Sequence, residues 1–111
     1  MAAKVVRLQE PILIVASAKQ DKRDAVDAGS FNTVVVQVNA LVVGTGSSAI
    51  QMEHAAVLEE NQFEVIGTPI SLINPGGPHT LVITTHSRYL RWTASAITGS
   101  PVASIDLVMR E

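Results

Sequence analysis

The chain has 111 residues with no cysteine, a formal net charge of −2 and only 16% charged residues. That length indicates one domain, the lack of cysteine excludes disulfide and thiolate chemistry, and the near-neutral charge gives no electrostatic reason to bind nucleic acid or an anionic membrane. Hydrophobic residues make up 47% and aromatic residues only 4%, so Val, Ile, Leu and Ala must build the core, which favours strands. A small domain with so few charges is expected to cover part of its surface in a homo-oligomer.

Residues 1–18 predict an extended N-terminal arm with edge strands, ahead of a single sandwich domain of residues 19–111. Pro11 separates strand candidates 4–8 and 12–18, because proline cannot donate to a β-ladder. The apolar runs are too short to span a bilayer, and no signal-peptide layout precedes them. The arm is too apolar for a free tail, so we expect it to pair with a neighbouring subunit or a capsid. The interface residues expected in the arm are Val5, Val6, Leu8, Ile12, Leu13 and Ile14.

The rest of the chain alternates with period two, which is typical of half-buried strands. The longest candidates, 32–43 and 49–58, are joined by a glycine-rich turn and predict a long hairpin. Residues 74–78, Asn-Pro-Gly-Gly-Pro, are the strongest turn signal. Residues 19–29 are the most charged part and predict a loop with a short edge strand. The strands expected in the sandwich are 25–28, 32–43, 49–58, 62–66, 70–73, 81–85, 89–97 and 102–110.

Short strands at close spacing, without a helical pattern, predict an all-β fold: an antiparallel β-sandwich of eight or nine strands. The alternation places Trp92, the only tryptophan, on the apolar face of its strand. On the same reasoning, Ala56 and Leu58 should point inward from the strand 49–58. The core residues expected from the pattern are Val36, Val38, Ile50, Met52, Leu90, Trp92, Ile105 and Leu107.

Residues 44–48, Gly-Thr-Gly-Ser-Ser, superficially resemble a phosphate-binding loop. Such a loop must open a helix, whereas here a strand pattern follows, so we expect a hairpin turn. No Gly-x-Ser-x-Gly elbow is present, and no Ser, His and Asp can be assigned to a catalytic triad. Adjacent Glu59 and Glu60 are expected at a loop tip, because acid/base carboxylates must oppose one another across a cleft. The sequence therefore predicts no catalytic residues and no cofactor.

The histidines His54, His79 and His86 lack the spacing of metal ligands, so we expect a partly buried His54 and two surface histidines rather than a zinc site. Asp21, Asp24 and Asp27 recur every three residues, which does not match the alternate oxygens of a calcium loop. A solvated loop is the preferred interpretation, with bound calcium as the alternative. The prediction is that the chain has no metal site.

Arg88, Tyr89 and Arg91 are expected to form an outward aromatic and basic cluster on the strand 89–97. Such a cluster could stack a sugar or a base, but Tyr and Arg are also enriched at protein contacts. We expect Tyr89 and Arg91 to serve an interface. A glycan-binding module using Tyr89, Arg91 and the Trp92 region is the alternative, against which the inward direction of Trp92 argues.

Six segments carry a family resemblance. They are Phe31-Asn-Thr-Val-Val-Val, the Gly44-Thr-Gly turn, Ile50-Gln-Met-Glu-His, an acidic turn with Phe63, Arg88-Tyr-Leu-Arg-Trp and Ser104-Ile-Asp-Leu-Val-Met. Together they make residues 28–110 resemble the small jelly-roll-like β-sandwich proteins encoded among the structural genes of tailed bacteriophages and prophages. The chain departs from that pattern at 54–63, where many relatives carry Ser-Asn/Asp-Asp-Gly and a Trp.

The resemblance implies a non-enzymatic virion structural protein, made in the host cytoplasm and located in the virion. The expected role is a capsid decoration, cement or minor head protein that stabilises the shell. A tail-associated virion protein is an alternative. The expected partners are copies of the chain itself, as a homo-oligomer and specifically a trimer, and the major capsid protein or other virion proteins. Neither nucleic acid nor membrane is expected as a partner.

Overall fold

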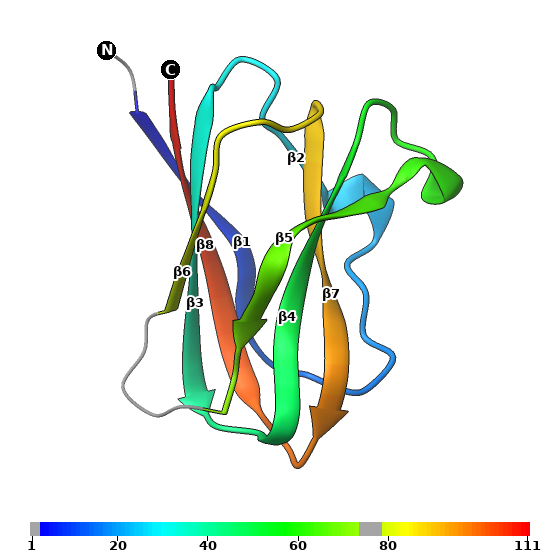
Figure 1. Ribbon diagram of the computed structural model, residues 1–111, viewed down its shortest axis with the longest axis vertical. Helices are drawn as coiled ribbons and strands as arrows, with labels where there is room; N and C mark the ends of the chain where they lie inside the picture. Colours follow the sequence, from blue (N-terminus) through cyan, green and yellow to red (C-terminus); the bar gives the residue numbers. More distant parts are fainter. Residues whose placement is uncertain (1–2, 74–78) are drawn as a thin grey trace.

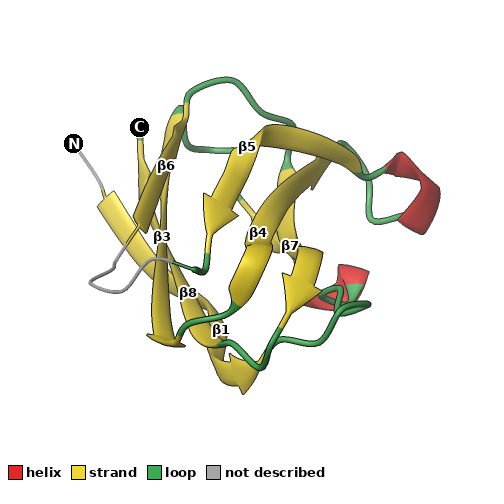
Figure 2. Cartoon of the chain, turned by 60° about the horizontal axis from the view of Figure 1, so that its bottom comes forward, coloured by secondary structure: helices red, strands yellow, loops and turns green. Residues whose placement is uncertain are grey.

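The computed structural model describes residues 3–73 and 79–111, which form two four-stranded antiparallel sheets packed face to face (Figure 1). The first sheet has the order β1-β8-β3-β6, and the second sheet has the order β2-β7-β4-β5. Two short 3₁₀ turns, η1 (Lys22–Asp24) and η2 (Glu60–Gln62), lie on the side of the second sheet (Figure 2). The strands are β1 (Ala3–Leu13), β2 (Val26–Asp27), β3 (Thr33–Val42), β4 (Thr45–Ala55), β5 (Glu64–Ser71), β6 (His79–Ile83), β7 (Tyr89–Thr98) and β8 (Val102–Arg110).

The strands pair in reverse order along the chain: β1 with β8, β2 with β7, β3 with β6 and β4 with β5. Two further pairings, β3 with β8 and β4 with β7, join these ribbons into sheets. This arrangement is the eight-stranded jelly roll. Consecutive strands alternate between the two layers except for β4 and β5, which are neighbours in the second sheet. The expected all-β, jelly-roll-like sandwich is confirmed.

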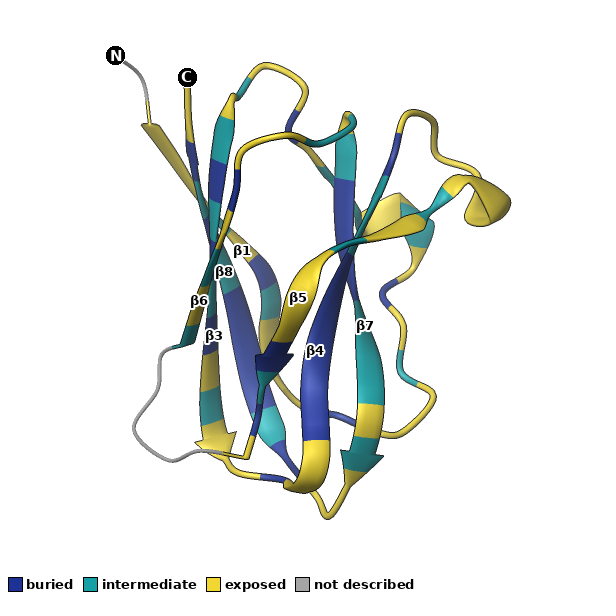
Figure 3. Cartoon of the chain, in the orientation of Figure 1, coloured by how far each residue is buried: buried dark blue, intermediate teal, exposed yellow. Residues whose placement is uncertain are grey.

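The core lies between the sheets and is built from the alternate residues of each strand (Figure 3). All eight residues expected in the core have at most 3% of their surface exposed. The Trp92 indole Nε1 donates to Oε1 of Gln9, 3.3 Å away, so the one polar atom of the ring has a partner inside the sandwich. Strand alternation therefore identified the layer-facing side of β3, β4, β7 and β8 correctly.

The expected hairpin of 32–43 and 49–58 is wrong, because β3 and β4 belong to different sheets. The chain crosses between the layers at Gly44, whose N–H donates to the Leu72 carbonyl at 2.9 Å. Gly46 has a φ of +63°, and the β4–β7 register shifts between Gly46 and Ala49. The glycine-rich stretch thus begins a strand with an irregularity, and no helix follows it. Ala56 and Leu58 are exposed because β4 ends at Ala55.

Pro11 does not split the N-terminal strand as expected. β1 is one edge strand whose pairing with β8 shifts register at Arg7–Gln9 and again at Gln9–Ile12, and edge strands with bulges tolerate proline. Segments 62–66 and 70–73 likewise form the single strand β5, irregular opposite Ile50–Met52. The strand expected at 81–85 is β6, two residues earlier. The turn expected at 74–78 lies outside the described residues.

The N-terminal segment is part of the sandwich itself, since β1 pairs with β8 along its length. Leu8 and Ile14 are buried in the core. Buried Gln20 holds the chain that follows: its side-chain amide donates to the Leu8 carbonyl at 3.0 Å, and its Oε1 accepts from the Trp92 N–H at 3.4 Å. Residues 3–14 therefore supply an edge strand and two buried side chains of the core.

Candidate functional site

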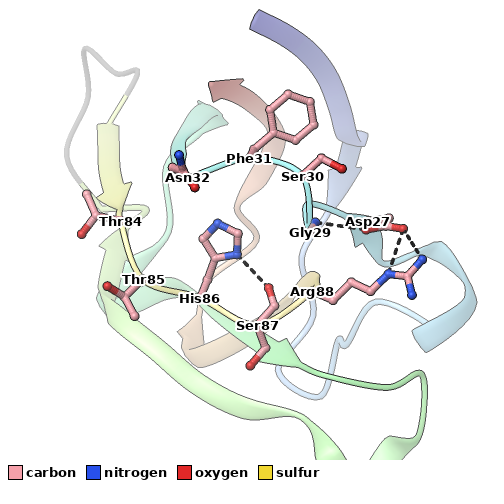
Figure 4. Close-up of a pocket in the computed structure, with 10 residues that line it drawn as sticks. All are labelled: Asp27, Gly29, Ser30, Phe31, Asn32, Thr84, Thr85, His86, Ser87 and Arg88. Atoms are coloured by element: carbon pink, nitrogen blue, oxygen red, sulfur yellow. Dashed lines mark hydrogen bonds and ion pairs between the residues drawn. The ribbon is translucent and has the colours of Figure 1, made fainter. Parts of the chain in front are cut away.

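The β2–β3 and β6–β7 connections lie side by side at one end of the sandwich and line a pocket that is open to solvent. The β2–β3 connection and the β6–β7 connection are joined by a hydrogen bond from the Ala28 N–H to the Arg88 carbonyl, 2.7 Å long. The pocket between them measures about 580 Å³. We call this hollow the loop-end pocket; its lining residues are Asp27, Gly29, Ser30, Phe31, Asn32, Thr84, Thr85, His86, Ser87 and Arg88 (Figure 4).

An ion pair forms one wall of the loop-end pocket. The Arg88 Nε and Nη2 atoms donate to Oδ2 of Asp27 at 3.1 and 2.9 Å, while Oδ1 accepts from the Gly29 N–H at 3.0 Å (Figure 4). The hydrogen bond from Arg88, followed by that from Gly29, lowers the pKa of the Asp27 carboxyl. The same bond to Asp27 raises the pKa of Arg88, whose guanidinium carbon also lies 5.1 Å from the centre of the Tyr89 ring. The Asp27–Arg88 pair therefore gives the pocket wall a guanidinium donor and a carboxylate acceptor, and its net charge is zero.

Two histidines contact the backbone of Ser87, the residue before Arg88. The Ser87 N–H donates to Nδ1 of His54 at 2.9 Å, so this nitrogen carries no proton. The Ser87 carbonyl lies 2.7 Å from Nδ1 of His86, and because a carbonyl only accepts, His86 must carry its proton there (Figure 4). When the ring is neutral, Nε2 of His86 is therefore an acceptor for a molecule in the pocket.

The histidines and aspartates considered above as possible metal ligands lie apart from one another in the fold. Within residues 3–73 and 79–111, no three His, Asp or Glu side chains gather closely enough to hold an ion. Asp21 caps η1, accepting from the Arg23 N–H at 2.9 Å, and Asp27 pairs with Arg88. Half-buried His79 is the first residue of β6 and pairs with Val38 of β3. His86 lies in the β6–β7 connection, after the other end of β6. The carboxylates of the Asp21, Asp24 and Asp27 series thus do not converge.

Arg91 is buried, and the expectation that it lies on an exposed interface is wrong. Its side chain is 1% exposed and donates to Glu53 at 2.9 Å, to two oxygens of Glu60 and to the Gln20 carbonyl at 3.3 Å. The Phe63 ring stacks on it, 3.9 Å from the guanidinium carbon to the ring centre. We call this group the Arg91 cluster. Alternation correctly put Arg91 on the outer face of β7, but the loops that carry Gln20 and Glu60 fold over that face.

The Arg91 cluster also argues against the alternative interpretation, a sugar site formed by Tyr89, Arg91 and the Trp92 region. Arg91 and Trp92 are both buried, and only Tyr89 of that set remains half-exposed. The hydrogen bond to Glu60 is the main reason that the pKa of Arg91 is raised, and it lowers the pKa of Glu60. The only indication of this cluster in the sequence is the acidic pair Glu59–Glu60 close to Phe63. The sequence does not show which arginine these residues contact.

The expected interface residues of the N-terminal segment divide into two groups. Val5, Ile12 and Leu13 are exposed, at 71%, 43% and 50%. Leu8 and Ile14 lie in the core, and Val6 is half-buried against it. Only the first group can meet a partner.

Val5 is one end of a row of four valines across the outer face of the first sheet. The strand register aligns Val5 with Val108, Val108 with Val35, and Val35 with Val82. These four residues form the valine row. Val5 and Val82 at its two ends are 71% and 58% exposed, and Val35 and Val108 between them are half-buried. Sequence reasoning missed this row because register between strands distant in sequence cannot be read from alternation.

A second apolar region lies where β1 and β3 end. Leu13, Val102 and Val42 are aligned across β1, β8 and β3. We call this region the apolar end; its exposed members are Ile12, Leu13, Val15, Leu41, Val42 and Val43. Between it and the valine row, Arg7 forms a two-armed ion pair with Asp106 at 2.9 and 3.2 Å.

Comparison with protein-family models, curated proteins and solved structures finds no match. Among the described residues, no helix has the length and apolar character needed to cross a membrane. Function must therefore be argued from the surfaces and the pocket described above.

Proposed function

We propose that this chain is a non-catalytic structural subunit that assembles with copies of itself through the outer face of the first sheet. The valine row is the observation that carries the proposal. The solvent-facing side of an antiparallel sheet normally bears polar side chains, yet here four aligned valines span all four strands. Contiguous apolar surface of this kind marks interaction sites.

A second copy of the chain is the occupant that fits this face best. At about 4.8 Å between strands and about 3.3 Å per residue, the first sheet offers roughly 550 Å² of flat surface. A stable interface needs about 800 Å² per partner, and the adjoining apolar end can supply the rest. The Arg7–Asp106 pair presents both charges side by side, so two copies of the face can meet without placing like charges together.

We propose that this assembly is part of a bacteriophage particle. The chain would serve there as a capsid decoration, cement or minor head protein. The strand-pattern resemblance of residues 28–110 supports this placement. The jelly roll is compatible with it, because the fold recurs in viral capsid domains, although it also occurs in lectins and cupins. In this role the chain would bind the major capsid protein or another virion protein. It would form a trimer if the face of one copy meets a different surface of the next, since two identical faces that meet form a dimer.

Self-association is tested by light scattering coupled to size exclusion, over a range of concentrations. Wild type should have the mass of an oligomer, with three chains if the trimer forms. Val82→Glu and Val5→Glu, at exposed ends of the valine row, should dissociate it. Val65→Glu is the matched control, since Val65 is 61% exposed on β5 of the other sheet. A monomeric wild type, or equal dissociation by the control, would overturn the proposed interface.

The bacteriophage role is tested separately. Portal, terminase and major capsid genes should lie beside the gene for this chain, and particles purified from the encoding organism should contain its peptides by mass spectrometry. Particles that lack these peptides would contradict a virion role and leave the self-association result standing.

A further inference from the structure

We propose that the loop-end pocket binds a neutral sugar through two adjacent hydroxyl groups. This inference is independent of the proposed assembly, because the pocket is built from the β2–β3 and β6–β7 connections rather than from the face of the first sheet. Its volume of about 580 Å³ is within the range of roughly 300–1,000 Å³ that small-molecule sites have.

The Asp27–Arg88 pair matches the chemistry of a vicinal diol. Each sugar hydroxyl can donate to a carboxylate oxygen and accept from a guanidinium N–H. Oδ1 of Asp27 uses one of its acceptor positions on Gly29, and Nη1 of Arg88 has no partner among the described residues. One hydroxyl can therefore donate to Asp27 while its neighbour accepts from Arg88.

The pair is already oriented before a ligand arrives. Gly29 fixes one carboxylate oxygen, Arg88 holds the other, and the Tyr89 ring lies beside the guanidinium. Pre-organised groups lose less conformational entropy on binding. The two charges cancel within the pocket wall, so a neutral ligand is favoured over an anion or a cation.

Other residues of the pocket add hydrogen-bonding groups that suit further hydroxyls. In the neutral ring of His86, Nε2 is an acceptor, because the Ser87 carbonyl holds the proton on Nδ1. The side chains of Asn32, Thr84 and Thr85 line the same pocket (Figure 4). Phe31 packs against the core, so polar contacts provide most of the recognition and the affinity should lie near millimolar, about −4 kcal/mol.

The test is a titration followed by ¹H–¹⁵N correlation NMR. The probes are the methyl glycosides of glucose, galactose and mannose, N-acetylglucosamine, and inorganic phosphate as the anion. At least one sugar should shift the amides of residues 27–32 and 84–88 with a saturating curve. Arg88→Gln should weaken this binding at least tenfold. Arg23→Gln is the matched control, because Arg23 forms a similar exposed pair with Asp21 outside the pocket.

Three results would overturn the proposal. These are no sugar shifting the pocket amides, phosphate alone shifting them, or Arg23→Gln weakening binding as much as Arg88→Gln. Should Arg88→Gln fail to fold, Asn32→Ala replaces it, since Asn32 is exposed and its side chain has no partner among the described residues. Repeating the titration on Val82→Glu separates the two proposals, because sugar binding should persist in a dissociated chain.

Discussion

The Ser87 N–H donates a hydrogen bond to Nδ1 of His54, 2.9 Å away, although the residues are 33 positions apart in sequence. The bond ties the β6–β7 connection to β4 of the second sheet. Because the Ser87 carbonyl also meets His86, both backbone polar groups of Ser87 have a partner. This explains how a loop that crosses the end of the sandwich keeps a defined path over the loop-end pocket.

Replacing His54 with Ala should lower the free energy of unfolding by about 1 kcal/mol, because the half-buried Ser87 N–H loses its acceptor. His54→Asn should lose less, since its Oδ1 can take the place of Nδ1. Urea unfolding measures both. Equal losses would show that the hydrogen bond does not contribute. Long-range ¹H–¹⁵N NMR should find the proton of neutral His54 on Nε2 and that of His86 on Nδ1.

Trp92→Ala should lower the free energy of unfolding by about 3–5 kcal/mol, the usual cost of emptying a large aromatic site in a core. Trp92 is 3% exposed, so native tryptophan fluorescence should be blue-shifted. Trp92→Phe is the milder comparison, because it keeps most of the ring volume and loses the hydrogen bond to Gln9. A native emission maximum equal to that of tryptophan in water would contradict the burial.

Arg91→Met should be strongly destabilising, by about 3 kcal/mol, because Glu53 would be left nearly buried without its positive partner. The double variant Arg91→Met with Glu53→Gln should recover part of this loss, since no uncompensated charge remains. Arg23→Met, which removes an exposed arginine from a comparable pair, should leave the thermal midpoint unchanged. Similar effects of Arg91→Met and Arg23→Met would argue against a buried cluster.

The protein should lose stability as the pH falls below about 4.5, the ordinary pKa of Glu. Hydrogen bonds from arginines lower the pKa values of Glu60 and Asp27. A lowered carboxyl pKa stabilises the fold above the unfolded value, and this contribution disappears as the pH falls through the folded value. Thermal midpoints should therefore decline towards pH 2, and less steeply in Arg91→Met. A constant midpoint across this range would contradict these pairs.

Local alternation was enough to predict the strands that carry the core. β3, β7 and β8 each carry apolar residues at alternate positions, and Val36, Trp92 and Leu107 are buried where this pattern puts them. A jelly roll, however, pairs strands far apart in sequence. The pattern of residues 32–58 fits a hairpin as well as it fits two strands in different layers, and only the tertiary packing distinguishes them.

The candidate surfaces were harder to predict, because each depends on contacts between distant residues. Arg91 alternates as an exposed residue, yet Glu60 and Phe63 come from a separate loop to cover it. The valine row requires the register of three strand pairs. Asp27 and Arg88 are 61 residues apart, and nothing in either local sequence indicates their pairing. Val5, Ile12 and Leu13 could be proposed as interface residues from sequence because the N-terminal segment is too apolar for a free tail.

The strand order also determines when this fold can form. In each sheet, a strand made late lies between two strands made early: β8 between β1 and β3, and β7 between β2 and β4. Ala3 pairs with Arg110, so nearly the whole chain must be closed into a loop for this contact. Folding should therefore be slow, on the millisecond-to-second scale of all-β topologies. During synthesis, the apolar strands β1 and β3 have no partner between them until β8 leaves the ribosome, so their unpaired edges are prone to aggregation in that interval.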